Sequence, residues 1–339
     1  MHTHPLMRIT NHHLSRRLGK LLAATCLFAA TLTPAFTEEA KKPAVGNGPL
    51  YRLVNQTGKF TDAECFWSLD HGKTWHSFAE QSTVPCPLGN GRLYFRLGPA
   101  PKSFGNRETI WDFIEYASEN SETWHGNTTQ VDAFCIPISI EMGDKKVGIT
   151  KSRSALFEKF RTDAPEPFKS CVQGNWIVSP CLATFGADGK NAHYFDAYID
   201  EVWAMYAEET KTPSGKWTGK VTDGALTFTP VGKGKPVTCA SKPSTQDAFM
   251  GTGVLATNPQ FCAAINRHVL ADPADWSNVD AFYKAEPCNW YAKFLHEHSI
   301  GNKAYGFCYD DVAEQAAFFS GKGRELTVTL RWDVETKGK

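Results

Sequence analysis

The order of hydrophobic and polar positions predicts strands in the first part of this chain. Before about residue 150, apolar residues alternate with polar ones, or form short runs that end at Gly, Pro, Asp or Asn. The expected strands cover residues 50–54, 65–69, 74–78, 92–97, 111–116 and 131–142. Pro137 lies inside the last of these and marks a bulge or an edge position, because proline has no N–H for a sheet ladder.

The middle of the chain has the spacing of helices instead. In residues 194–208, Phe195, Ile199, Val202 and Tyr206 fall on one helical face. The expected helices cover residues 152–160, 194–208, 260–270 and 280–298, with a hairpin at 216–230 and a closing strand at 325–332. This order predicts a β domain whose last strand follows a helical insertion, which costs little extra loop entropy.

The N-terminal residues are typical of an export signal. A basic stretch ends at Lys20, and Leu21–Leu32 then form an apolar run of 12 residues. A membrane-spanning helix needs about 20 such residues, and Thr33-Pro34-Ala35 offers a small-residue cleavage site. We expect residues 1–35 to be a signal peptide and 36–48 a linker, and the mature protein to be secreted, extracellular or periplasmic, without membrane contact.

The charge balance argues against nucleic acid as a partner. The chain has 36 basic and 36 acidic residues, and four of the basic ones lie in residues 1–36, so the mature chain is mildly acidic. Phosphate binding needs clustered Lys and Arg. A neutral polysaccharide has no such requirement, and the ten Trp offer apolar faces with a polar edge, on which sugars can stack.

Cysteines are numerous but lack the spacing of a metal site. Nine follow the expected cleavage site: Cys65, Cys86, Cys135, Cys171, Cys181, Cys239, Cys262, Cys288 and Cys308. None belongs to a CxxC pair, so we predict no zinc site and no other cofactor. Export favours disulfide bonds, and the odd number leaves at least one thiol without an intramolecular partner.

Two short motifs are interpreted as structural. Residues 68–75 (SLDHGKTW) match the Asp-box of β-propellers, but the motif occurs once and no repeat accompanies it, so we expect a stable hairpin. His296-Glu297-His298 lacks the HExxH spacing of zinc proteases, and we expect a surface or capping role.

Two carboxylates are candidates for catalysis. Glu115 lies in WDFIEY (111–116) and shares a strand face with Trp111 and Phe113, while Asp132 lies in QVDAF (130–134). On neighbouring strands, the two would point at one surface, as the carboxyl pair of a glycoside hydrolase does. Spacing alone leaves open that they are ordinary exposed acids.

Several segments, in the same order, resemble glycoside hydrolase family 64, the β-1,3-glucanases of the thaumatin-like superfamily. They are residues 53–58 (LVNQTG), 91–95 (GRLYF), 111–116 (WDFIEY), 131–140 (VDAFCIPISI), 261–267 (FCAAINR), 289–296 (NWYAKFLH) and 304–311 (AYGFCYDD). The resemblance implies a mainly β fold with an α/β insertion, in which a thaumatin-like β-barrel or sandwich domain and a mixed α/β domain form a wide cleft. Residues 49–165 and 301–333 would form the barrel, and 166–300 the mixed domain.

The resemblance also implies an activity and a set of site residues. The expected reaction is inverting, endo-acting hydrolysis of linear β-1,3-glucan to short oligosaccharides by a monomer. Glu115 would be the general acid and Asp132 the general base, with Trp124, Asp310 and Tyr309 binding substrate. Two alternatives remain: a glucan-binding protein of the same fold without catalysis, and a structural or inhibitory thaumatin-like protein without sugar affinity.

Overall fold

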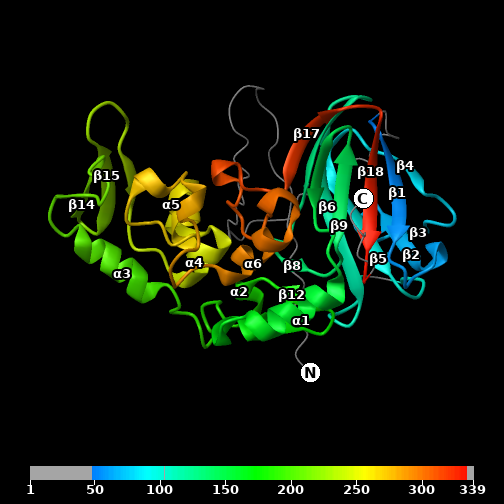
Figure 1. Cartoon of the computed structure of the whole chain (residues 1–339), viewed down its shortest axis with the longest axis horizontal. Coiled ribbons are helices and arrows are strands. Elements are labelled where there is room, and N and C mark those ends of the chain that lie inside the picture. The colour runs from blue at the N-terminus through cyan, green and yellow to red at the C-terminus, as the bar shows by residue number, and fades with distance from the viewer. Residues whose placement is uncertain (1–47, 103, 334–339) are drawn as a thin grey trace, which may run out of the picture.

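The computed structural model describes residues 48–102 and 104–333, so the predicted signal peptide and nearly all of the predicted linker lie outside the described residues. A β-sandwich forms one side of the molecule and a mixed α/β part forms the other (Figure 1). The described chain begins in the sandwich, crosses to the α/β part and returns to the sandwich for its last two strands.

The first sheet of the sandwich has five strands in the order β10-β9-β18-β1-β4. Their bounds are β1 Leu50–Gln56, β4 Thr83–Pro85, β9 Ile138–Met142, β10 Lys145–Gly148 and β18 Glu325–Arg331. The first and last strands, β1 and β18, run parallel, while the other pairs are antiparallel. The predicted closing strand thus lies in the middle of this sheet.

The second sheet has six strands in the order β17-β7-β6-β5-β2-β3 and is antiparallel throughout. Their bounds are β2 Cys65–Ser68, β3 His76–Ser77, β5 Gly89–Leu97, β6 Ile110–Ser118, β7 Thr123–Thr128 and β17 Phe318–Lys322. The inner face of this sheet packs on the first sheet through an apolar core that includes Leu93, Ile114 and Val328, all fully buried. The opposite, outer face of the six-stranded sheet points away from that core.

The α/β part contains two small sheets and the helices of the described chain. The strands are β8 Ala133–Phe134, β11 Val172–Gln173 and β12 Trp176–Val178 in one sheet, and β13 Thr210–Lys211, β14 Trp217–Thr222, β15 Ala225–Pro230 and β16 Val237–Cys239 in the other. The α-helices are α1 Arg153–Asp163, α2 Pro180–Ala183, α3 Asp196–Met205, α4 Thr245–Met250, α5 Pro259–Asn266 and α6 Trp290–His298. Short 3-10 helices are η1 Asp62–Glu64 in the sandwich, and η2 Glu166–Cys171, η3 Gly253–Leu255, η4 Pro273–Asp275, η5 Val279–Ala281, η6 Ile300–Asn302 and η7 Val312–Glu314.

Two apolar cores divide the chain somewhat differently from the predicted boundaries. Helix α1 packs in the core of the α/β part through Leu156, Phe157 and Phe160, although it falls inside the predicted barrel segment 49–165. The segment after α6, with Ala304 and Phe307, belongs to the same core. The return to the sandwich therefore comes at β17 and not at residue 301.

The prediction of one strand over 131–142 is wrong. Pro137 separates β8 from β9, and the two short strands belong to different sheets. The buried carboxylate of Asp112 accepts the N–H groups of Cys135 and Ile136, both at 3.0 Å, so these donors are not free to extend a ladder. The predicted helix 280–298 is also shorter than expected, because α6 begins at Trp290.

The Asp-box residues form the expected hairpin. Asp70 Oδ1 accepts hydrogen bonds from Ser68 Oγ (2.8 Å) and from the N–H groups of Lys73 (3.0 Å) and Thr74 (2.9 Å). The turn contains His71 and Gly72, both at positive φ. One carboxylate thus satisfies the donors of a turn that connects β2 to β3.

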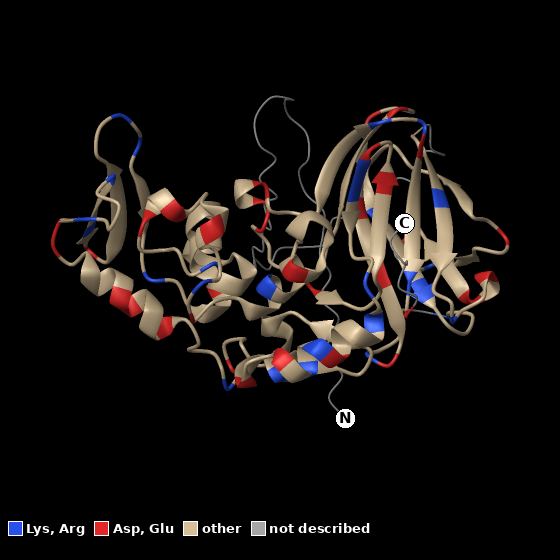
Figure 2. Ribbon diagram, in the orientation of Figure 1, with Lys and Arg blue, Asp and Glu red and all other residues tan. Residues whose placement is uncertain are grey.

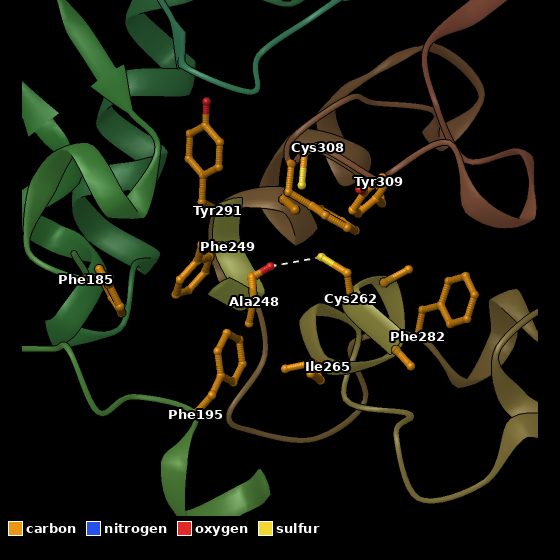
Figure 3. Close-up of a cluster of buried hydrophobic side chains, with 14 of the residues drawn as sticks. Phe185, Phe195, Ala248, Phe249, Cys262, Ile265, Phe282, Tyr291, Cys308 and Tyr309 are labelled. Carbon is orange, nitrogen blue, oxygen red and sulfur yellow. Dashed lines mark hydrogen bonds between the residues drawn. The ribbon is translucent and has the colours of Figure 1, made fainter. Parts of the chain in front are cut away.

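The expected disulfides are absent from the described residues, where all nine cysteines are free thiols. Eight of the nine are buried. Figure 3 shows Cys262 and Cys308 inside an aromatic cluster of the α/β core, where the Cys262 thiol donates to the Ala248 carbonyl at 3.1 Å. These cysteine side chains therefore stabilise the fold by packing in the core and not by forming disulfide bonds. Across the described ranges, no helix has the length and apolarity needed to cross a membrane.

Candidate active site

Glu115 stands in a row of side chains on the outer face of the six-stranded sheet. Strand register pairs Glu115 on β6 with Arg92 on β5, and with Asn127 on β7. Paired positions put their side chains on the same face of a sheet. The two neighbouring strands therefore place a cation on one side of Glu115 and an amide on the other.

The contacts of Glu115 distinguish its two oxygens. Arg92 donates to Oε1 through Nε (3.1 Å) and through an Nη2 group (2.9 Å), and the Asn127 amide reaches Oε2 at 3.4 Å. The side chains of Arg92 and Glu115 are 24% and 33% exposed, so the ion pair borders solvent. Asn127 Oδ1 is buried and has no hydrogen-bond partner among the described residues.

Asp132 lies beside this row, but in a connection and not on a neighbouring strand as predicted. It follows β7 and precedes β8, where the chain passes from the sandwich to the α/β part. The Asp132 carbonyl accepts the N–H of Ser179 at 2.8 Å, and β8 pairs with β12 immediately afterwards. Burial raises the pKa of the Asp132 carboxyl, the Arg92 charge lowers it and the Glu115 charge raises it. The two candidate acids thus lie close enough to influence each other through one shared cation.

A third carboxylate, that of Asp112, lies on the inner side of the sheet and holds the chain segment that follows Asp132. It lies on β6 three residues before Glu115, on the inner face, and is 5% exposed. Its Oδ2 accepts the N–H groups of Cys135 and Ile136, and its Oδ1 accepts its neighbour's N–H. Burial and, to a lesser extent, the Asp132 charge raise the pKa of Asp112 to about 7 against the opposing effect of these N–H donors. Asp112 and Arg92 are not among the residues predicted from the sequence, because only pairing across strands reveals their roles.

Aromatic rings surround the acids on the outer face. The Arg92 guanidinium lies 4.2 Å from the centre of the Phe113 ring, and Tyr94 and Trp111 continue this largely buried aromatic cluster. Trp111 meets Trp176 of β12 edge to face, with ring centres 4.7 Å apart. The aromatic cluster therefore extends from the sandwich to the α/β part.

The prediction that Trp124 binds substrate is wrong. Trp124 is 0% exposed and belongs to the sandwich core, where its Nε1–H donates to Tyr51 Oη at 3.1 Å. Register explains this: Trp124 pairs with Ser118, which is on the inner face, whereas Asn127 pairs with Glu115 on the outer face. Side chains alternate along a strand, so Trp124 and Glu115 point to opposite sides.

Asp310 and Tyr309 are not surface residues either, so their predicted contact with substrate is also wrong. Asp310 is 0% exposed and accepts hydrogen bonds from Arg267 Nη2 (3.0 Å) and His296 Nε2 (2.9 Å). Tyr309 is 2% exposed and donates to the Ala256 carbonyl at 2.6 Å. Figure 3 places Tyr309 within the aromatic cluster of the core.

Of the surface or capping role predicted for His296 and His298, the surface part is wrong because both side chains are buried, whereas His298 Nδ1 does bond the Phe294 carbonyl in the last turns of α6, at 2.8 Å. Each is 7% exposed. His296 faces Asp310 with one ring nitrogen and the Asn302 carbonyl with the other, at 2.8 Å. His298 stacks on Phe294 with ring centres 4.3 Å apart.

Charge and shape elsewhere on the described residues were compared with the predicted site. Acidic and basic residues are interspersed over helices and strands in both parts (Figure 2), which is unlike a nucleic-acid interface. A hollow of about 360 Å³ lies against α3 and α4 and is lined by residues including His193, Asp196 and Lys242, none of them from the predicted site. Within the described ranges, no group of three or more His, Cys, Asp or Glu residues could hold a metal ion.

Two carboxyl groups in unlike surroundings, beside aromatic rings at an open sheet face, are typical of enzymes that hydrolyse sugars. The sequence profile of the beta-1,3-glucanase family, glycoside hydrolase family 64, matches residues 81–330. The chain therefore belongs to glycoside hydrolase family 64.

Known proteins agree with this assignment. The chain is 25% identical over 296 residues to a glucan endo-1,3-beta-glucosidase from Cellulosimicrobium cellulans, a match that covers 76% of this chain. It resembles the crystal structure of a family 64 beta-1,3-glucanase domain from Clostridium beijerinckii with a TM-score of 0.72 and 28% identity, over 86% of this chain and all of that one. A laminaripentaose-producing family 64 enzyme from Paenibacillus barengoltzii, complexed with laminarihexaose, matches with a TM-score of 0.65 and 28% identity over 87% of this chain and 78% of that one. The chain spans about half the length of the curated relatives it matches, 52% in each case.

Proposed function

We propose that this chain is a secreted β-1,3-glucanase that cuts linear β-1,3-glucan internally, with inversion at the anomeric carbon. Family membership supports the substrate class. The observation that carries the proposal is the ion pair of Glu115 with Arg92 beside an aromatic cluster, with Asp132 near enough for the Arg92 charge to lower the pKa of its carboxyl.

We assign Glu115 as general acid and Asp132 as general base. An inverting enzyme keeps its carboxyls roughly 6.5–9.5 Å apart so that a water fits between base and sugar. Glu115 must carry a proton before it can donate one to the leaving oxygen. Because both Arg92 donors go to Oε1, that proton belongs on Oε2, the oxygen nearest Asn127. Rotation of the Asn127 amide would then present its unpartnered Oδ1 to the new O–H as an acceptor.

We further infer that the sandwich is of the thaumatin-like type, that a cleft runs between it and the α/β part, and that the protein acts as a monomer. The crossing of the chain at Asp132 supports a substrate path between the two parts. Export rests on the sequence pattern, and the mature chain should begin between Phe36 and Glu39. Secreted material that retains Met1 would refute the proposed cleavage.

Catalysis is tested with purified protein and laminarin. We expect new reducing ends, and an α-anomer as the first product in proton NMR; a β-anomer first would exclude Asp132 as base of an inverting reaction. Glu115→Gln and Asp132→Asn should each lower the rate about 10²–10⁴-fold, and azide should rescue Asp132→Asn with an α-glycosyl azide as product. Glu122→Gln and Asp144→Asn, at exposed acids of neighbouring turns, are the matched controls and should keep full activity.

One observation favours the alternative of binding without cleavage. Both Arg92 hydrogen bonds hold Glu115 Oε1 in an ion pair, an arrangement that a binding surface without catalysis would also have. That alternative predicts affinity for laminarin without new reducing ends. The same incubation, combined with a binding measurement, distinguishes the two.

A further inference from the structure

Phe318 is the next member of the row that contains the candidate acid. It begins β17, the edge strand, and pairs with Asn127, which in turn pairs with Glu115. Side chains at paired positions share a face, so the order along the outer face is Phe318, Asn127, Glu115, Arg92. Phe318 is not among the residues predicted from the sequence, because its sequence neighbours reveal neither its strand register nor its exposure.

The exposure of Phe318 is unusual within this chain. The ring is 40% exposed, and no other Phe, Tyr or Trp among residues 48–102 and 104–333 is classed as exposed. Its neighbours Ala317 and Phe319 point inward and are 1% and 7% exposed. The core beneath β17 is therefore already filled, and packing gives no reason for a second aromatic ring on the outer side.

The surroundings of Phe318 suit a sugar ring. On the same face, the next pair along β17 and β7 is Ser320 with His125, whose Oγ and Nδ1 are 2.7 Å apart. The exposed Ser320 hydroxyl and the half-buried His125 imidazole thus lie beside an exposed aromatic face. An apolar face with a few polar groups at its edge is the usual composition of a ligand subsite.

We propose that Phe318 is the stacking platform of a glucan subsite at the β17 edge of the active site, and that it binds a glucosyl unit beyond those joined by the cleaved bond. The proposal rests on the proposed function. Two strand spacings separate Phe318 from Glu115, roughly 10 Å, so the ring cannot contact the sugars directly at the acid. Its contribution should therefore be to affinity for long substrates, not to bond breaking.

The test measures binding in a hydrolysis-deficient background. Laminarioligosaccharides of two to seven units are titrated calorimetrically into Glu115→Gln, and into the same variant carrying Phe318→Ala, Phe318→Tyr or Val231→Ala. Covering part of an aromatic face is worth roughly 5–10-fold in affinity. We expect this loss with Phe318→Ala for the longest oligosaccharides only, full affinity with Phe318→Tyr, and no change with Val231→Ala, an exposed apolar side chain next to β15 in the α/β part.

Each outcome separates this proposal from the proposed function. Equal affinity of Phe318→Ala and its parent for every oligosaccharide would overturn the subsite and leave the glucanase assignment untouched. An equal loss for all lengths would also overturn it, because it would mean a general disturbance of the site. If the parent binds no oligosaccharide and the wild type releases no reducing ends from laminarin, both proposals fail.

Discussion

Removal of the Asp310 charge should strongly destabilise the α/β part. It should change the affinity for glucan little. Asp310 is fully buried and is the shared partner of Arg267, 0% exposed, and His296, 7% exposed. Its Oδ2 also accepts the N–H of Gly306 at 2.9 Å. Substitution Asp310→Asn keeps the shape of the side chain but leaves a buried guanidinium without its counter-charge.

The magnitude follows from burial. Breaking a buried ion pair by removing one partner costs about 3–5 kcal/mol, because the remaining charge stays desolvated. Arg267 cannot lose its proton to escape this cost, and its Nε and Nη1 already lack hydrogen-bond partners among the described residues. His296, in contrast, can lose its proton, so part of the destabilisation should depend on pH.

The pH dependence has a definite sign. Burial opposes charge on both groups, but their attraction wins: the pKa of His296 is raised and the pKa of Asp310 is lowered. The His296 contribution to stability is complete below its unfolded pKa of about 6.5 and is lost as pH rises through its folded pKa. The Asp310 contribution is present above about pH 3.9 and is lost as pH falls through its folded pKa. Asp310→Asn should therefore cost most near pH 5–6 and less at pH 8.

Urea unfolding followed by Trp fluorescence gives the free energy of unfolding for wild type and variant at several pH values. Asp223→Asn is the matched control, since Asp223 is exposed in the β14–β15 turn at positive φ, where Asn is tolerated, and should change stability by at most about 0.5 kcal/mol. A loss below 1 kcal/mol for Asp310→Asn, accompanied by weaker binding of laminarin oligosaccharides, would refute this reasoning and restore Asp310 to the substrate site.

Four further predictions concern the sandwich and the acid pair. Trp124→Ala should destabilise the protein by about 3–5 kcal/mol in urea unfolding, as buried Trp truncations do, and Trp124→Phe by less; a stable variant with weaker glucan affinity would contradict its burial. Asp112→Asn should flatten the plot of unfolding free energy against pH between about 4 and 7, because a carboxyl whose folded pKa is raised to about 7 loses its stabilising contribution as pH rises through that interval; an unchanged slope would argue against it. The acidic limb of kcat/KM should lie above the ordinary Asp pKa of about 3.9, because burial raises the pKa of Asp132 and the base acts only when ionised; a limb at or below that value would contradict this. Asn127→Ala should lower kcat roughly tenfold, the value of one hydrogen bond to the proton on Glu115, and an unchanged kcat at every pH would exclude that contact.

The burial of Trp124 could not be predicted from its local sequence. Its polar neighbours suggest an exposed loop, but the residue belongs to β7, and exposure depends on which residue of β6 it opposes. Because side chains alternate, a shift of one position would exchange the inner and outer faces. The turn between β6 and β7 fixes the register of the two strands, and the local sequence around Trp124 does not reveal that register.

The position of Asp132 in the fold could not be predicted from the sequence either, for a different reason. The sequence pattern paired this carboxylate with Glu115 and assigned it to a neighbouring strand. In the structure it lies in a connection that Asp112 holds through the backbone of Cys135 and Ile136. A buried acid whose partners are main-chain N–H groups leaves no pattern along the chain, so its role is visible only in three dimensions.

By itself, the sequence determined the local elements and the class of protein. Alternation and turn residues located strands such as β1, β5, β6 and β18, helical spacing located α1, α3 and α5, and ordered segments identified the family. The tertiary structure decided what each polar or aromatic residue does. Asp310 is structural because Arg267 and His296, 43 and 14 residues away, surround it, and Phe318 is exposed because Phe319 fills the core beneath it. Local periodicity is set by backbone geometry within a few residues, whereas burial and charge pairing arise from contacts between segments far apart in the chain.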